Sequence, residues 1–206
     1  MLKIKGNAQW AKVFEPDTKF VPEGEYSIEV SLPEEQAADV CEQLDSLAQN
    51  KLEEAVKDNP KLKTVLSTRK SYKQEVDDNG NPTGNIVFKT KLKARVKSRD
   101  GQTFEQKPMV VDAKRTPMTQ NVLVGNGSLV NVAAEPIPYV MQSTKQVGVS
   151  LRLKAVQVIN LVEYASNSSA IFDEEEGYVS AAVSKDNAAD VFGNEDGVTN
   201  ANEGDF

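Results

Sequence analysis

The 206-residue chain contains no histidine and one cysteine, and its 24 basic and 31 acidic side chains give a net charge of −7. The missing histidine removes the commonest general base and zinc ligand, and a lone cysteine excludes an internal disulfide. No apolar run reaches membrane-spanning length, and the first residues lack the apolar block of a signal peptide. We therefore expect a cytoplasmic protein that contacts no membrane.

The first predicted elements are two strands and a helix. Residues 2–14 and 25–32 alternate in polarity, which is typical of half-buried strands. Pro33 and the acids after it begin a helix that extends to about Asp58. The apolar residues of this helix recur at spacings of three and four. Cys41 lies among them, and we interpret it as a core residue rather than a reactive thiol.

The middle of the chain is less regular. Residues 59–85 predict a basic segment without a period, either a mobile loop beside a binding face or a plain surface insertion. A clear strand follows at 86–97. Asp100-Gly101 then predicts a hairpin turn, with a returning strand at 103–111.

Two further strands complete the pattern. Residues 128–134 form one strand, which Pro136 and Pro138 are expected to close, and residues 149–164 form the other. The second half of this last strand is apolar on both faces, as expected of a strand inside a closed barrel.

These elements predict a mainly β protein. Five or six hairpin-connected strands with one long helix indicate an OB-fold-like Greek-key barrel over residues 1–164, and 39% apolar residues suffice for its core. Residues 165–206 are rich in Ser, Asn, Asp, Glu and Gly, so we expect them to form a disordered acidic tail.

Charge is unevenly distributed along the chain. Residues 60–160 contain 17 Lys and Arg against 7 Asp and Glu, whereas residues 165–206 contain one Lys against 10 acids. A basic centre followed by an acidic end is typical of a nucleic-acid-binding protein that carries its own competitor. The acids before residue 164 are scattered singly, so we expect no metal, no other cofactor and no catalytic residue.

The strand at 86–97 gives the strongest functional signal. Its outward positions are all basic: Lys89, Lys91, Lys93, Arg95 and Lys97. Cations two positions apart on a strand lie roughly 6.5–7 Å from one another, close to the spacing of successive phosphates. A solvated strand face is the simpler interpretation. Mutual repulsion is uncompensated within the strand, however, and this favours an anionic polymer as the partner.

The other candidate residues are basic or aromatic. Basic side chains would follow the phosphates, and aromatic side chains would stack on bases. The further basic candidates are Lys3, Lys5, Lys114, Arg115, Arg152 and Lys154. The aromatic candidates are Trp10, Phe14, Tyr72 and Tyr139, and for Trp10 a place in the core is an equally good interpretation. Together they predict sequence-tolerant binding of single strands by a protein that is not an enzyme.

Short segments in a fixed order carry a family resemblance. They are Ser31-Leu32-Pro33, Val110-Val111-Asp112-Ala113-Lys114, Gly127-Ser128, Pro138-Tyr139, Gly148-Val149-Ser150-Leu151, Leu161-Val162-Glu163-Tyr164 and Gly204-Asp205-Phe206. With them the chain resembles the single-stranded DNA-binding replication proteins of tailed bacteriophages, of the podophage type.

The resemblance implies an OB-fold core that acts in DNA replication, recombination or repair in the cytoplasm of the infected bacterial host. It implies that Tyr139 contacts DNA. It also implies that the tail contacts the phage DNA polymerase and helicase through Asp205 and Phe206. We expect the acidic tail to compete for the DNA groove and thereby to suppress a weaker binding of duplex DNA.

Two other functions stay open at this point. The basic strand could pair with an acidic neighbour in a phage structural or assembly protein. Alternatively, scattered carboxylates could hold a metal ion in a nuclease or recombination factor. Filter binding of labelled oligonucleotides separates DNA binding from assembly, and cleavage on addition of magnesium tests the nuclease. The sequence leaves the oligomeric state open, a homodimer included.

Overall fold

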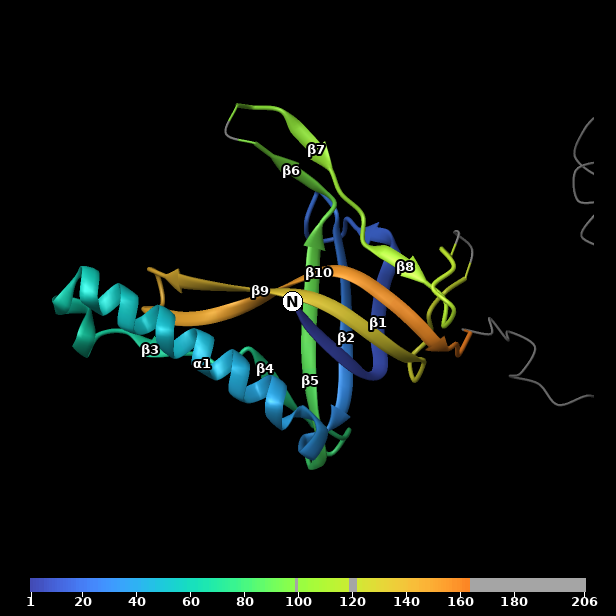
Figure 1. Cartoon of the computed structure of the whole chain (residues 1–206), viewed down its shortest axis with the longest axis horizontal. Coiled ribbons are helices and arrows are strands. Elements are labelled where there is room, and N and C mark those ends of the chain that lie inside the picture. The colour runs from blue at the N-terminus through green and yellow to red at the C-terminus, as the bar shows by residue number, and fades with distance from the viewer. Residues whose placement is uncertain (99, 119–121, 164–206) are drawn as a thin grey trace, which may run out of the picture. The chain divides into compact units, whose positions relative to one another are not determined.

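The computed structural model describes residues 1–98, 100–118 and 122–163, which belong to one compact unit, Met1–Ala165 (Figure 1). The expected acidic tail lies outside the described residues. The elements in chain order are β1 (Leu2–Asp17), β2 (Glu25–Pro33), α1 (Glu34–Asp58), the 3-10 helix η1 (Pro60–Thr64), β3 (Ser67–Thr68), β4 (Tyr72–Val76), β5 (Pro82–Lys93), β6 (Arg95–Lys97), β7 (Thr103–Glu105), β8 (Met109–Val111), β9 (Leu129–Met141) and β10 (Gln146–Asn160).

Five strands close into a barrel. Antiparallel pairs join β9 to β1, β1 to β2, β2 to β5 and β9 to β10, and a parallel pairing of β10 with β5 completes the ring. Inward-facing apolar side chains of all five strands form the core, with Ile4, Ile28, Phe88, Val130 and Leu153 among the most deeply buried. The predicted fold class, a mainly β OB-fold-like barrel with one long helix, is confirmed.

β1 contributes to two sides of the barrel. Its first part pairs with β9 from Leu2 to Asn7, and its second part pairs with β2 from Asn7 onward. Near this crossing Gly6 lies against β2, where an added Cβ would collide with the Ser31 carbonyl oxygen. Only glycine therefore allows the two backbones to approach so closely.

α1 follows β2 directly and packs against β9 and β10. Pro33 precedes it, acids occupy its first turn and Lys57 its last turn, as the sequence predicts. Ala37 and Leu44 are buried in the core, and Cys41 packs against it half-buried. Burial raises the pKa of the Cys41 thiol, which is consistent with its interpretation as a packing residue.

The predictions for residues 59–111 are wrong in three places. The segment expected to be irregular contains β3 and β4, and β4 pairs with β5. The basic strand is interrupted at Ala94, so β5 ends at Lys93 and β6 belongs to a separate hairpin with β7. The hairpin itself is as predicted, but the returning strand divides into β7 and β8, and β8 pairs with β10.

The predicted ends of the last two strands are also wrong. β9 continues through Pro136 and Pro138 to Met141. Proline is tolerated there because β1 pairs only with residues 129–134, so the remainder of β9 has a partner on one side only, namely β10. β10 begins earlier than expected, at Gln146, and ends at Asn160.

Candidate nucleic-acid interface

The outer surface where β1, β2 and β5 lie side by side gathers several of the predicted residues. We call it the β1–β2–β5 face. The register places Gln9 beside Glu29, and Glu29 beside Lys89. Residues of the opposite parity, such as Ile28 and Phe88, fill the core. Side chains on this face therefore point outward because the alternation of the strands fixes them there.

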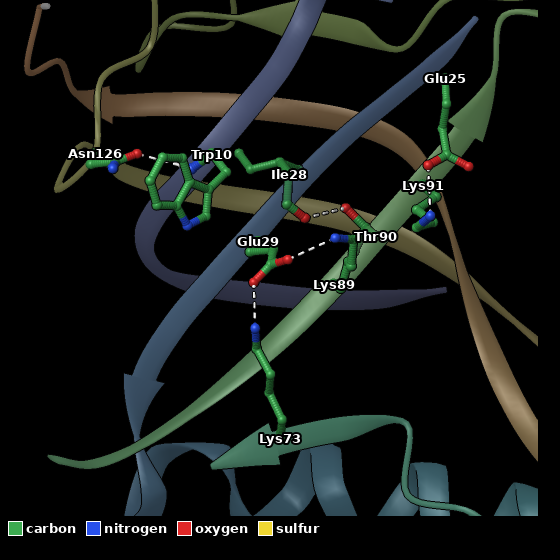
Figure 2. A network of polar contacts seen from close by, with 9 residues as sticks. All are labelled: Trp10, Glu25, Ile28, Glu29, Lys73, Lys89, Thr90, Lys91 and Asn126. Carbon is green, nitrogen blue, oxygen red and sulfur yellow. Dashed lines mark hydrogen bonds and ion pairs between the residues drawn. The ribbon is translucent and has the colours of Figure 1, made fainter. Parts of the chain in front are cut away.

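The lysines of this face are paired with acids from the neighbouring strand. Lys89 Nζ lies 2.8 Å from Glu29 Oε1, and Lys73 Nζ of β4 lies 3.0 Å from Glu29 Oε2 (Figure 2). Lys91 Nζ lies 2.6 Å from Glu25 Oε1. Charge that is uncompensated within β5 is thus compensated by β2, which the sequence pattern did not reveal. Lys73 is a further cation of the face that sequence reasoning missed.

Glu29 holds the most enclosed of these charges. Its side chain is 9% exposed, whereas those of Lys73 and Lys89 are 64% and 50% exposed. Burial opposes ionisation of Glu29, but the hydrogen bonds from Lys89 and Lys73 outweigh it and hold the pKa of the carboxyl below its ordinary value. The ammonium groups therefore remain open to solvent above a fixed carboxylate.

Trp10 stands on a bulge of β1, between the paired positions Gln9 and Lys12. Its backbone φ is 51°, in the left-handed region that residues other than glycine rarely adopt. Its backbone N–H donates to Asn126 Oδ1 at 2.9 Å (Figure 2), and Gly127 N–H donates to the Ala8 carbonyl oxygen at 2.9 Å. The turn at residues 125–127 thus fixes the bulge.

The bulge determines whether Trp10 is buried or exposed. The indole is 67% exposed, so its interpretation as a core residue is wrong and its prediction as an exposed aromatic is supported. An unfavourable backbone conformation held by neighbouring contacts is common at functional sites. Asn126, which holds it, was missed because the sequence shows only a glycine-flanked turn there.

Two of the aromatic candidates pack against the protein. Phe14 is 8% exposed and belongs to the core. The ring of Tyr72 packs on Phe88 with centroids 5.9 Å apart, and its hydroxyl donates to Asp45 Oδ2 at 2.9 Å. The prediction that Phe14 is a stacking platform is wrong, because its ring is buried in the core. For Tyr72, which is half-buried, stacking on a base stays a prediction.

Tyr139 lies on β9 opposite Gly148 of β10. An added Cβ at Gly148 would stand 2.9 Å from Tyr139 Oη, so the absence of a side chain leaves room for the tyrosine ring. Tyr139 is half-buried. Its contact with DNA stays a prediction.

The basic surface continues from β5 onto β10. Arg152 is paired with Lys91 across the seam that closes the barrel. Arg152 and Lys154 both lie near Glu135 of β9, with N–O distances of 3.6 and 2.9 Å. These two candidates therefore extend the β1–β2–β5 face and share its pattern of cations held by an acid.

Four other basic candidates border a different part of the barrel. Lys3 and Lys5 are exposed on β1 where it pairs with Ala133 and Asn131 of β9. Lys114 and Arg115 lie in a turn after β8, and that turn is attached to β10 by a hydrogen bond from Gln157 Nε2 to the Ala113 carbonyl oxygen at 3.0 Å. The topology thus does not bring these four side chains to the β1–β2–β5 face.

The hairpin of β6 and β7 projects from the barrel (Figure 1), and we call it the arm. Arg95 pairs with Glu105 on it at 3.2 Å, and Lys97 is exposed. Phe104 is 53% exposed beside its strand partner Val96. Sequence reasoning missed Phe104, because a single aromatic residue in a three-residue strand gives no pattern.

The remaining predictions concern absences and the tail. Within residues 1–98, 100–118 and 122–163, no three acidic or cysteine side chains are grouped as metal ligands. Among the same residues no helix is long and apolar enough to cross a membrane. Asp205 and Phe206 lie outside the described residues.

A closed OB-fold-like barrel that presents an exposed indole and a row of lysines on its outer surface is typical of proteins that bind nucleic-acid strands. Residues 6–161 match the family model of the single-stranded DNA-binding protein of bacteriophage T7, and the chain belongs to this family. The resemblance deduced from short sequence segments is confirmed. A comparison with curated proteins gives no match.

A solved crystal structure supports the fold. The crystal structure of gp2.5, a single-stranded DNA-binding protein encoded by bacteriophage T7, is similar with a TM-score of 0.65 and 21% identity, over 87% of this chain and 98% of that chain. The single-stranded DNA-binding protein from bacteriophage Enc34 in complex with ssDNA has a TM-score of 0.47 and 14% identity, over 78% of this chain and 86% of that chain.

Proposed function

We propose that the protein binds single-stranded DNA without sequence preference and without catalysis, in support of phage DNA replication in the cytoplasm of the infected bacterium. The observation that carries the proposal is the exposed Trp10, held on a bulge that begins after Gln9, the residue that the register places beside Glu29 and so one strand away from Lys89. Membership of the family supports the same function. The chain contains no histidine, which agrees with a binding protein rather than an enzyme.

The strand would be held by two complementary interactions. Phosphate oxygens would accept hydrogen bonds from the ammonium groups of Lys73, Lys89 and Lys91, whose side chains are 64%, 50% and 47% exposed. A base would stack on Trp10, a contact that is independent of base identity because every base has a π face. Arg152, adjacent to Lys91, would carry the path across to β10.

The deciding experiment is binding of fluorescent oligo(dT) and of a duplex of equal length at several salt concentrations, with and without magnesium. A single-strand-binding protein binds oligo(dT) more tightly, loses affinity steeply with salt and cleaves neither DNA. Failure to bind oligo(dT) would favour a structural or assembly role, and magnesium-dependent cleavage would favour a nuclease.

We propose that the acidic segment at residues 165–206 competes with DNA for this face. Ten carboxylates on the same chain act at a high effective concentration, which can reach about millimolar for short tethers. Replacing Asp173, Glu174, Glu175 and Glu176 by Asn or Gln in the full chain should tighten DNA binding, more for duplex than for oligo(dT), and most at low salt where screening is least. Equal affinities of the variant and the wild type at low salt would contradict the competition.

We also propose that Asp205 and Phe206 contact the phage DNA polymerase and helicase. Deleting Phe206 should weaken association with these proteins in a pull-down from infected cells, and it should leave the affinity for oligo(dT) unchanged because an uncharged side chain is removed. The matched control is Phe192→Ala, which removes an aromatic ring from the same acidic segment. Unchanged association after deletion of Phe206, or equal loss in the control, would contradict this role.

A further inference from the structure

The β1–β2–β5 face contains carboxylates at positions where a surface built only for phosphates would have none. Glu25 and Glu29 alternate on β2 with Ser27 and Ser31, and the register places both glutamates against lysines of β5. Glu29 is the more deeply placed, with a residue exposure of 7%. Each of these acids is bonded to the cations that the proposed function assigns to phosphates.

We propose that Glu25 and Glu29 are specificity-determining residues that weaken purely electrostatic binding, so that tight binding requires base stacking in addition. The inference rests on the proposed function and deepens it. Glu29 shares one carboxylate between two ammonium groups, at 2.8 and 3.0 Å, which reduces the charge of the group of three from +2 to +1. Glu25 neutralises Lys91 in the same way at 2.6 Å.

The carboxylates remain in place when DNA binds. Glu29 is enclosed by the sheet and cannot swing away from the face, whereas an ammonium group has three donors and can bond a phosphate while it still contacts Glu29. Every bound phosphate therefore lies near a fixed negative charge. Exposed ion pairs contribute little to stability, and an enclosed pair is often no more stabilising than apolar residues of similar size. Stability of the fold therefore does not by itself account for these glutamates at positions facing a basic strand.

The repulsion from these carboxylates discriminates between nucleic acids. A duplex has the higher charge density and depends on its phosphates alone, because its bases are stacked inside. A single strand brings fewer phosphates close to these carboxylates, and it gains a base contact at Trp10. Trp10 follows Gln9, the residue of β1 that pairs with Glu29. Removing the carboxylates should therefore favour duplex DNA more than oligo(dT).

The test compares full-length Glu29→Gln, Glu25→Gln and the double variant with the wild type, by titration of oligo(dT) and of duplex DNA at two salt concentrations. If each of the two carboxylates repels a phosphate about as strongly as the partners of an exposed ion pair attract each other, the double variant gains about tenfold in affinity for duplex. We expect a gain of about threefold for oligo(dT). Both gains should shrink at high salt.

The matched control is Glu54→Gln, which removes the same charge and an ion pair, Lys51 to Glu54 at 2.8 Å, from α1. Gains for Glu25→Gln and Glu29→Gln that exceed those of Glu54→Gln, and that are larger for duplex than for oligo(dT), support the inference, whereas gains of equal size for the two DNAs overturn it. Gains equal to those of Glu54→Gln would show that only the net charge of the protein matters. Weaker binding would show that the glutamates position the lysines for DNA. Either result overturns the inference. If thermal melting shows that Glu29→Gln does not fold, the result for Glu25→Gln decides. Failure of the wild type to bind oligo(dT) would instead overturn the proposed function.

Discussion

Replacing Trp10 by alanine should lower the affinity for oligo(dT) about 10- to 100-fold, because stacking on an aromatic side chain contributes roughly 1–3 kcal/mol per base. The loss should be the same at low and high salt, since stacking releases no counterions. Fluorescence-anisotropy titrations at three salt concentrations measure both the loss and its salt dependence.

Trp10→Gly makes the same test independent of stability. Trp10 has a φ of 51°, which glycine adopts without the roughly 1–2 kcal/mol that a left-handed conformation costs other residues. The variant should therefore melt at the same temperature or higher while it binds DNA more weakly. Val65→Ala is the control, because Val65 is 48% exposed after η1 and belongs to none of β1, β2, β5 and β10. A lower melting temperature with unchanged affinity would make Trp10 a structural residue.

Replacing Lys89, Lys91 and Lys93 together by alanine should make the slope of log K against log salt shallower by about two, because each phosphate contact on a single strand contributes about −0.7. Affinity at low salt should fall steeply, since Glu25 would then face the DNA without Lys91, and Glu29 would keep Lys73 as its one lysine partner. The slope is measured with oligo(dT) over a series of salt concentrations.

The control for these lysines is the triple variant of Lys57, Lys61 and Lys63, which are exposed at the end of α1 and in η1. It removes the same charge from another part of the surface and should leave the slope unchanged. If both triple variants changed the slope equally, net charge alone would account for the effect, and β5 would have no special place in the interface.

The alternation of apolar residues was sufficient to predict the barrel strands and the helix. Tyr26, Ile28, Val30 and Leu32 are all buried as their spacing predicts, because a strand with one solvated face must keep a period of two. The helix was predictable from its own period, because its apolar residues recur at spacings of three and four. Its acidic first turn and the preceding proline located its start. Short segments in a fixed order were sufficient to identify the family.

The interface was only partly predictable, because its charge depends on which strands are neighbours. The lysines of β5 were visible in the sequence, but Glu29 lies 60 positions from Lys89 and meets it only through the register. Alternation also continues from β5 into β6 across Ala94, so the pattern conceals the point at which the chain leaves the barrel for the arm.

The bulge in β1 explains why Trp10 and Phe14 were wrongly assigned to one face of the strand. Trp10 and Phe14 have the same parity in the sequence and were assigned to one face. The pairing shifts between Gln9 and Lys12, so parity is not conserved from one side of the bulge to the other. Trp10 is consequently exposed, whereas Phe14 is buried. A local insertion of this kind leaves no trace in the hydrophobic pattern.

The seam between β5 and β10 has a consequence for the order in which the protein folds. β10 is the last strand of the barrel in the chain, and its parallel pairing with β5 joins residues as distant as Thr90 and Leu151. During synthesis β1, β2, β4 and β5 can pair as soon as they emerge, but the part of the β5 edge that β4 leaves uncovered, at Thr90 and Lys91, has to wait for β10. Contacts of such long range make barrel closure the slow step. Until then the nascent sheet exposes an unpaired strand edge, the kind of surface through which incomplete chains aggregate.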